Sequence, residues 1–481
     1  MSVARSLPFA AALLATACTV GPDYEAPTLA LPDTFRAERG DGLDDGAVVD
    51  ARWWRSFDDP RLGELVERAL RQNLDLRASL ARLASARALR GVAAADRWPQ
   101  VDANGSYTYR NESENTPFGA FIPRTDIHQV TFDAAWELDL WGRVRRSVEA
   151  ADADLERSVA DTDAVALSVA AEVARNYVEL RAAQRRLAIA RDNLGLQQRT
   201  LELVRARLAA GLVVERDVAQ ARTNVETTRS RLPSLETAAI AAENRLAVLL
   251  GGAPGSLDLA VAEAPTMPTS TVAVAVGVPA DLLRRRPDVR AAERRLAGAV
   301  ARIGLAEADR YPQFRLSGQI GLAANAANDF FDRGSDLSGF GPSLRWNLFD
   351  GGRLKHRIES LEAEAEAVQV EYERAVLLAL EETENAMTAF VREQARRRAL
   401  AAAATEARRA VELAQTQYRE GLSDFQTVLD SERIVATIED DLASSDAAVA
   451  TGLIALYKAL GGGFEPPAPV AAQTPRQPSP R

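Results

Sequence analysis

The chain has 481 residues, of which 47% are hydrophobic, so most of it can bury a core and general disorder is excluded. Its formal net charge is -10, and no cluster of arginines with aromatic residues stands out, which argues against nucleic acid as a partner. The chain has only two histidines and one cysteine, without metal-ligand or phosphate-loop spacing. We therefore expect no enzyme activity, no metal and no bound cofactor.

The amino terminus predicts export and lipid attachment. Arg5, an apolar stretch at residues 7–14 and three small residues precede Cys18. This order is typical of a secretory signal, residues 1–17, and resembles a lipobox, in which the cysteine after the cleavage point receives a covalent lipid. The alternative is a chance cysteine within a signal. Because no apolar run reaches the roughly 18 to 20 residues of a membrane-spanning helix, we expect any membrane crossing to use strands.

Comparison of the sequence with itself reveals an internal duplication. Residues 96–100 match residues 309–313, and Trp136 matches Trp346 in the same order. The copies differ in length by three residues between Gln100 and Trp136, where a loop absorbs an insertion. The predicted domains are the signal 1–17, an extended lipid-anchored segment 18–60, a first repeat 61–252 with a hairpin at about 100–141, a linker 253–285, a second repeat 286–463 with a hairpin at about 313–349, and a disordered tail 464–481.

Four segments alternate apolar and polar residues with a period of two and predict strands of about 9 to 11 residues. In the second and fourth segments the apolar positions continue to Leu140 and Leu348. An apolar outer face and a wet inner face suit a membrane barrel, although a soluble sandwich shows the same alternation. The charged residues expected to face the lumen, where they tune ion preference or are simply solvated, are Asp102, Asp133, Glu137, Asp139, Arg315 and Arg345.

Four strands cannot close a barrel, so the chain must pool strands with copies of itself. Composition does not decide between two, three and four copies.

The sequence also predicts two long helices of similar length. Residues 142–208 lack proline and predict one helix of roughly 65 residues, near 100 Å, which residues 353–419 repeat. Gly211 and Gly421 end these helices, and a returning helix follows each. A coiled-coil seam recurs every seven residues at Val173, Leu180, Leu187, Leu194, Leu201 and Leu208.

Five motifs carry a family resemblance. They are CTVGPDY at residues 18–24, WWRSF at 53–57, PADLLRRRPD at 279–288, WNLFDGGR at 346–353 and YKALGGG at 457–463. In this order, over almost the whole mature chain, they resemble the TolC-like outer-membrane factors of the lipoprotein branch. The resemblance implies a mainly α-helical fold with a β-barrel: a homotrimer that shares twelve strands and continues as a periplasmic α-helical tunnel.

The resemblance also implies function. Such a trimer is a passive efflux duct that docks onto a periplasmic adaptor, or membrane fusion, protein bound to an inner-membrane pump, usually of the resistance-nodulation-division class. Its lipid anchor and barrel place it in the outer-membrane lipid. Trp53 and Trp54 are implied to pack the amino-terminal segment against the helices. The residues implied to dock the adaptor, unless they form an ordinary helical turn, are Gly211, Leu212, Gly421, Leu422 and Ser423.

The resemblance places a gate at the second tip. Asp430 matches an aspartate that relatives place in a ring at the closed end of the tunnel, where like carboxylates repel one another and attract cations. Thr427 and Gln426 stand where some relatives have an aspartate and a leucine. A plain surface position for Asp430 is the alternative. For the whole chain, the alternatives are a duct for protein secretion by an ATP-driven exporter and a coiled-coil lipoprotein that spaces the envelope.

Overall fold

The computed structural model describes residues 19–37, 40, 42–44, 51–113, 115–117, 121, 124–257, 266–270, 274–277, 279–280 and 285–462. The predicted signal, Cys18 and the predicted tail therefore lie outside the described residues. The chain forms two compact units. The first, here the sheet unit, comprises Met1–Thr28, Arg82–Val159 and Ala291–Glu373; the second, here the tip unit, comprises Leu29–Ala81, Ala160–Arg290 and Arg374–Arg481.

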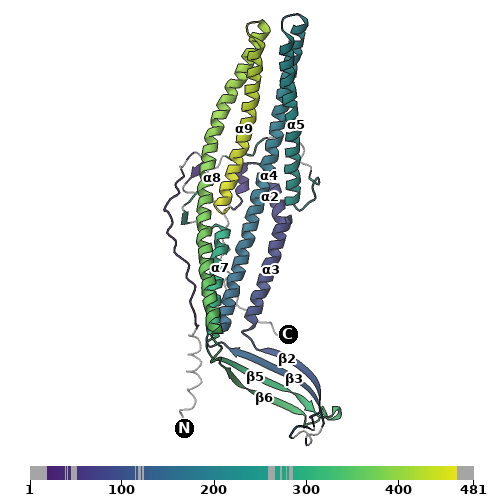
Figure 1. Ribbon diagram of the computed structural model, residues 1–481, viewed down its shortest axis with the longest axis vertical. Coiled ribbons are helices and arrows are strands. Elements are labelled where there is room, and N and C mark those ends of the chain that lie inside the picture. The colour runs from purple at the N-terminus through teal and green to yellow at the C-terminus, as the bar shows by residue number, and fades with distance from the viewer. Residues whose placement is uncertain are drawn as a thin grey trace, which may run out of the picture. The chain divides into compact units, whose positions relative to one another are not determined.

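The order of elements repeats, as the duplication predicts (Figure 1). The first copy consists of α3 (Leu74–Ala95), β2 (Gln100–Arg110), β3 (Thr125–Leu138), α4 (Arg143–Ala209) and α5 (Glu215–Leu249). The second consists of α7 (Pro287–Ala308), β5 (Gln313–Ala324), β6 (Asp336–Arg345), α8 (Arg353–Glu420) and α9 (Phe425–Ala459). Shorter elements are β1 (Leu43–Asp44), η1 (Trp53–Phe57), α2 (Pro60–Gln72), β4 (Val274–Ala275) and η3 (Ala327–Asp329). No helix among the described residues is both long and apolar enough to cross a membrane.

The sheet unit contains one antiparallel sheet in the order β2-β3-β5-β6. Its register pairs Asp102 with Asp133 and Glu137 with Arg315. Because side chains alternate between faces, these charges and Arg345 lie on one face. The opposite face is apolar and exposed, with Val101, Tyr107, Tyr109, Val130, Phe132, Trp136, Leu316, Ile320, Phe340 and Leu344. The register thus confirms the two-faced strands that the sequence predicts.

Two predicted strand ends were wrong. β3 and β6 end before Leu140 and Leu348. The residues that follow each strand form a short connection, and an aspartate in it caps the next helix. The Asp139 carboxylate accepts hydrogen bonds from two backbone N–H groups in the first turn of α4, at 3.1 and 2.9 Å. The Asp350 carboxylate accepts from the Gly352 N–H, just before α8, and from the Leu354 N–H in its first turn, both at 3.0 Å. These bonds satisfy helix donors that otherwise lack partners.

The helices of the sheet unit form a row in the same order as the strands. α3 contacts α4, α4 contacts α7, and α7 contacts α8. The contacts are Arg90 to Asp152 at 2.7 Å, Arg294 to Glu156 at 3.0 Å, and the apolar cluster of Ala299, Ile303 and Ala365. α3 and β2, which both belong to the first copy, therefore lie at one end of the row and of the sheet. α8 and β6, which belong to the second copy, lie at the other end.

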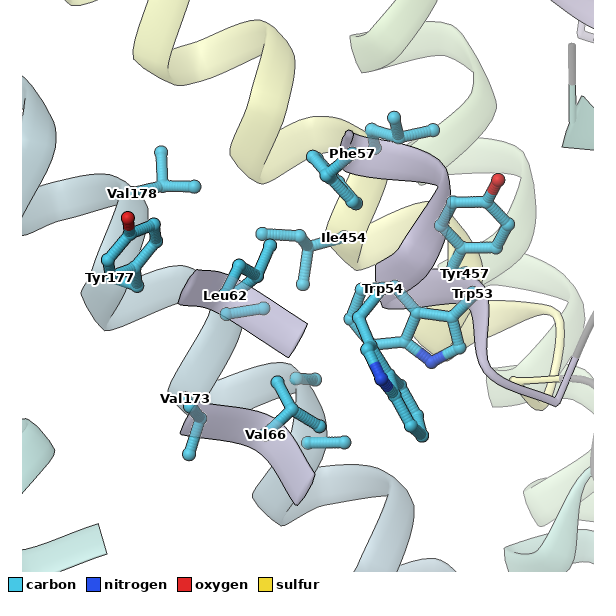
Figure 2. Packing of buried hydrophobic residues seen from close by; sticks show 14 of the residues in the cluster. Trp53, Trp54, Phe57, Leu62, Val66, Val173, Tyr177, Val178, Ile454 and Tyr457 are labelled. Atoms are coloured by element: carbon cyan, nitrogen blue, oxygen red, sulfur yellow. The ribbon is translucent and has the colours of Figure 1, made fainter. Parts of the chain in front are cut away.

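The core of the tip unit surrounds two tryptophans (Figure 2). Trp53 is 1% exposed and stacks on Tyr457 of α9, with ring centroids 5.3 Å apart. Trp54 lies edge-on to Trp53 at 5.8 Å. This confirms the packing role implied for both residues. The seam of α4 is also buried in this unit, at Val173, Leu180, Leu187 and Leu201.

The PADLLRRRPD motif has a structural role in the tip unit. Arg286 is 7% exposed and donates hydrogen bonds to the Ala459 carbonyl at 3.0 Å, to Asp288 at 3.0 and 2.7 Å, and to Glu382 at 2.7 Å. It thereby joins the start of α7 to α8 and to the end of α9. Burial raises the pKa of Asp288, but the hydrogen bonds and charge of Arg286 outweigh it and leave that pKa below its ordinary value.

Candidate functional site: the two hairpin tips

Both hairpin tips end their long helix with the same backbone turn. Gly211 and Gly421 have φ of 70° and 76°, a region that favours glycine. The N–H of each glycine bonds to the carbonyl three residues earlier, at 2.9 and 3.1 Å, and the N–H of the next residue bonds to the carbonyl five residues before itself, at 2.9 and 2.8 Å. This is the Schellman pattern, which satisfies the last carbonyls of the helix without any side chain.

The residues after these glycines are apolar and exposed. Leu212 is 70% exposed and Leu422 is 75% exposed, so neither covers the helix end behind it. Val214, at the foot of α5, is 56% exposed. Ser423 is half-buried, and its hydroxyl has no hydrogen-bond partner among the described atoms. Each tip therefore presents an apolar side chain from a turn whose backbone is already satisfied.

An apolar cluster in the tip unit lies beneath the turns and contains residues of all four tip helices. Tyr418 of this cluster is 2% exposed, and its ring centroid lies 5.9 Å from that of Phe425. The Arg207 guanidinium lies 4.2 Å from the centre of the Tyr418 ring and donates a hydrogen bond to the Arg419 carbonyl at 2.9 Å. Burial raises the pKa of the Tyr418 hydroxyl. The cluster includes Leu201, Val204, Val218, Ala221, Val225, Ala414, Val428 and Leu429.

The predicted gate residues share one short hydrogen-bonded stretch at the start of α9. Asp424 caps the helix: its carboxylate accepts from the Thr427 N–H at 2.9 Å and the Thr427 hydroxyl at 2.7 Å. These two bonds hold the pKa of Asp424 below its usual range. The Gln426 amide donates to Asp430 at 2.9 Å, and Arg433 lies 4.0 Å from the same carboxylate. The Asp430 side chain remains 53% exposed, so its charge is accessible to a neighbour.

A buried carboxyl group that we did not predict lies next to this stretch. Glu432 is 2% exposed and accepts hydrogen bonds from the Thr200 hydroxyl at 2.6 Å and the Gln415 amide at 3.1 Å. Burial raises its pKa, and the two donors oppose that rise. A signal was present, because Glu432 follows Phe425 and Leu429 at helical spacing and so falls on the buried stripe of α9.

The predicted lumen charges divide into two groups. Five lie on the polar face of the sheet: Asp102, Asp133, Glu137, Arg315 and Arg345. Asp133 accepts bonds from Asn104 and Thr131, and Glu137 forms a two-bonded pair with Arg143 at 2.6 and 2.8 Å. Asp139 does not lie on this face with the other five, because it follows the end of β3 and caps α4. No group of described residues has the composition of a metal site.

Comparison with known proteins decides the family. The profile of the outer membrane efflux protein family matches residues 65–252 and 278–462, which is most of the chain. The chain belongs to the outer membrane efflux protein family. This outer membrane efflux protein therefore acts in the outer membrane as a passive channel component and not as an enzyme.

Individual relatives match along most of their length. The protein is 33% identical to nodulation protein T of Rhizobium leguminosarum bv. trifolii over 94% of this chain and 96% of the relative. It is also 33% identical to the pyoverdine export outer membrane protein OpmQ of Pseudomonas putida, over 88% and 90%.

Solved structures agree with this assignment. The outer-membrane channel OprN superposes with a TM-score of 0.86 at 38% identity, over 93% of this chain and all of that one. The MtrE channel of Neisseria gonorrhoeae, in its open state, gives a TM-score of 0.82 at 29% identity, over 93% and 98%. The fold expected from the family resemblance is therefore confirmed.

Proposed function

We propose that the chain is one subunit of a homotrimeric duct that carries small molecules out of the cell. The duct receives them from a periplasmic adaptor protein bound to an inner-membrane pump of the resistance-nodulation-division class. A covalent lipid on Cys18 anchors each subunit. The names of several relatives support a transport role, including a toluene efflux pump protein of Pseudomonas putida and a cation efflux protein of Escherichia coli. The gate is proposed at Asp430, Thr427 and Gln426.

The edges of the sheet unit support assembly with further copies. β2 and β6 each have one neighbour in the sheet, and α3 and α8 end the helix row. Exposed apolar residues lie on both edge helices, with Leu89 and Val92 on α3 and Val370 on α8. Exposed charges of opposite sign also occur on these helices, with Arg82 and Arg87 on α3 and Glu362, Glu364 and Glu366 among the charges of α8. Contact of α8 with α3 of the next copy, and of β6 with its β2, closes a head-to-tail ring.

The observation that carries the docking proposal is the pair of exposed leucines at the two tips. A side chain that leaves a well-capped turn and stays three-quarters exposed is available to a partner at little conformational cost. A trimer presents six such leucines, and similar leucines repeated around a ring favour a symmetric adaptor.

The docking test compares Leu212→Asp and Leu422→Asp with Phe331→Asp. Phe331 is 86% exposed in the turn between β5 and β6, so its variant controls for a general loss of surface apolarity. We expect each tip variant to lower adaptor cross-linking in cells at least tenfold, while the trimer and the control remain as in the native protein. Unchanged cross-linking in both tip variants would remove the tips from the docking surface.

A separate measurement tests the gate. In planar bilayers, Asp430→Asn should lower single-channel conductance and weaken cation preference, because three like charges at a constriction repel one another, which favours opening, and attract cations. Glu420→Gln is the matched control, since Glu420 is an exposed acid of the same tip outside the predicted gate. Equal effects of the two variants would show a general response to tip charge rather than a gate.

A further inference from the structure

The segment that follows Cys18 lies in a slot on the sheet unit. The Val20 N–H donates a hydrogen bond to the Trp141 carbonyl at 3.1 Å. Three glycines make room for the segment. A Cβ atom on Gly142 would lie 2.7 Å from the side chain of Thr19, and one on Gly21 would overlap the Cα atom of Gly304. Gly21 and Gly142 also have φ of 86° and 84°, which a larger residue adopts poorly.

One buried arginine holds the segment in this slot. Arg146 of α4 is 2% exposed. Its Nε atom donates to the Val20 carbonyl at 3.2 Å, and its Nη2 atom donates to the Gly21 carbonyl at 3.2 Å and to Asp23 at 2.7 Å. Its Nη1 atom donates to Glu149 at 2.8 Å. Three of the four bonds thus go to the segment, and charged donors make such bonds stronger than neutral ones.

Aromatic residues gather at the same end of the sheet, where β2 and β5 begin and β3 and β6 end. The Trp136 indole donates to the Arg97 carbonyl at 3.0 Å, and the Trp346 indole makes the equivalent bond to the Arg310 carbonyl at 3.0 Å. Trp141 donates to the Pro312 carbonyl at 2.9 Å. Others at this end are Trp98, 73% exposed, and Phe349, 88% exposed. Belts of tryptophan are typical of the level at which a membrane protein meets lipid headgroups.

We propose that Arg146, with Gly21, Gly142 and Gly304, forms an anchor clamp that holds residues 19–23 at this aromatic belt. A lipid attached to Cys18 then enters the membrane surface at the level of the belt. The partner of this surface is the headgroup region of a phospholipid layer. The inference rests on the proposed lipid at Cys18, and it adds that the lipid is positioned by the folded chain and not by a free tether. A fixed attachment point lowers the ordering cost of inserting the lipid.

Fluorescence quenching tests the position. Cys18 is the only cysteine, and lipidation converts it to a thioether, so Pro22→Cys gives the full chain one free thiol for a bimane label. The protein is reconstituted in phosphatidylethanolamine and phosphatidylglycerol vesicles that contain a headgroup nitroxide lipid. We expect strong quenching that Arg146→Ala reduces by at least half. Arg302→Ala is the control, because Arg302 pairs with Asp154 and makes no hydrogen bond to the segment.

Proteolysis tests the clamp without relying on the lipid. A glutamate-specific protease cuts after Glu25, which is exposed. We expect Arg146→Ala to speed this cut about tenfold, or about 1.4 kcal/mol of lost protection. Asp23→Asn, which alters only an exposed partner, should give a smaller increase and covers the case in which Arg146→Ala does not assemble. Unchanged cleavage in both variants would overturn the clamp. Mass spectrometry of the amino-terminal peptide reports lipidation separately, so a failure of the proposed anchor is distinguished from a failure of the clamp.

Discussion

The two hairpin tips have the same backbone and different side chains. The first tip consists of a glycine turn, an exposed leucine and a returning helix whose N-cap, Val214, makes no side-chain hydrogen bond. The second has the same turn and leucine, with an aspartate cap, a buried aromatic pair and a buried carboxyl group. The two tips thus share the ends of their helices and differ in their interiors, since the buried aromatic pair and the buried carboxyl group belong to the second. We therefore expect the second tip to be held more tightly and to contain the elements that respond to pH.

The largest effect is expected from the aromatic pair. Tyr418→Ala should destabilise the second tip by about 3–5 kcal/mol, because a buried aromatic ring and its contact with Arg207 are lost. The equivalent Leu208→Ala should cost the first tip about 1–2 kcal/mol, since Leu208 is only partly buried. Native-state hydrogen exchange in the last turns of α4 and α8 measures both. Equal costs would contradict the proposed asymmetry.

The turn glycines should behave alike. Gly211→Val and Gly421→Val should each destabilise their tip by about 1–2 kcal/mol, because a β-branched residue resists positive φ. Apart from the adjoining residues, no described heavy atom lies within 4 Å of an added Cβ at either position, so backbone strain is the main cost. Asparagine at the same sites tolerates this conformation and serves as the control. A clearly larger cost at one tip, measured by hydrogen exchange, would show that the two turns are not equivalent.

A cap can be transferred from the second tip to the first. Val214→Asp should stabilise the start of α5 by about 1 kcal/mol, since a side-chain oxygen then accepts from the backbone N–H groups of the first helical turn. Asp424→Ala should weaken the start of α9. The pKa of Asp424 is lowered in the folded chain, so its stabilisation is present above the ordinary aspartate pKa and is lost as pH falls through the lowered value. Amide exchange in the first turn of each helix, followed from pH 7 to 3, checks both expectations.

The smallest effect is expected from Glu432→Gln, which removes a charge and keeps the shape of the side chain. Glu432→Gln should stabilise the second tip at neutral pH, because burial raises the pKa of Glu432 and so penalises its ionised form. The native tip therefore loses stability as pH rises from the ordinary glutamate pKa through the raised one, whereas the variant does not. Below the ordinary glutamate pKa the two proteins should agree. A pH-independent difference in tip exchange would attribute the effect to packing and not to protonation.

Repetition and periodicity predict most of the fold. Self-comparison predicts the order of elements, glycine predicts both tips, and the alternation of side chains predicts the two faces of the sheet. Strand ends were harder to predict, because Asp139 and Asp350 look like two more polar positions until their carboxylates are seen to cap the next helix. The alternation of polar and apolar residues does not show which side chain accepts a hydrogen bond from the first backbone N–H groups of the next helix.

The residues that were missed depend on distant contacts. Arg146 stands in an arginine-rich run and has no local feature that distinguishes it from Arg143 or Arg145. Three of its bonds go to residues more than 120 positions away, and only the fold reveals them. Glu432 differs, because a charge on an apolar helical stripe is visible in the sequence. The docking and gate assignments depend on the family resemblance, since an exposed leucine or aspartate carries no sign of its partner.

At each tip, the main chain closes the end of the helix, and the side chain of the next residue takes no part in that closure. Because the helix end is closed by main-chain bonds, the residue after each glycine can change without loss of the hairpin. The outermost side chain is then free to vary without a cost to the turn. A duplicated gene offers two such positions that can vary independently. We therefore expect substitutions at Leu212 or Leu422, on the proposed docking surface, to alter partner binding while the fold remains intact.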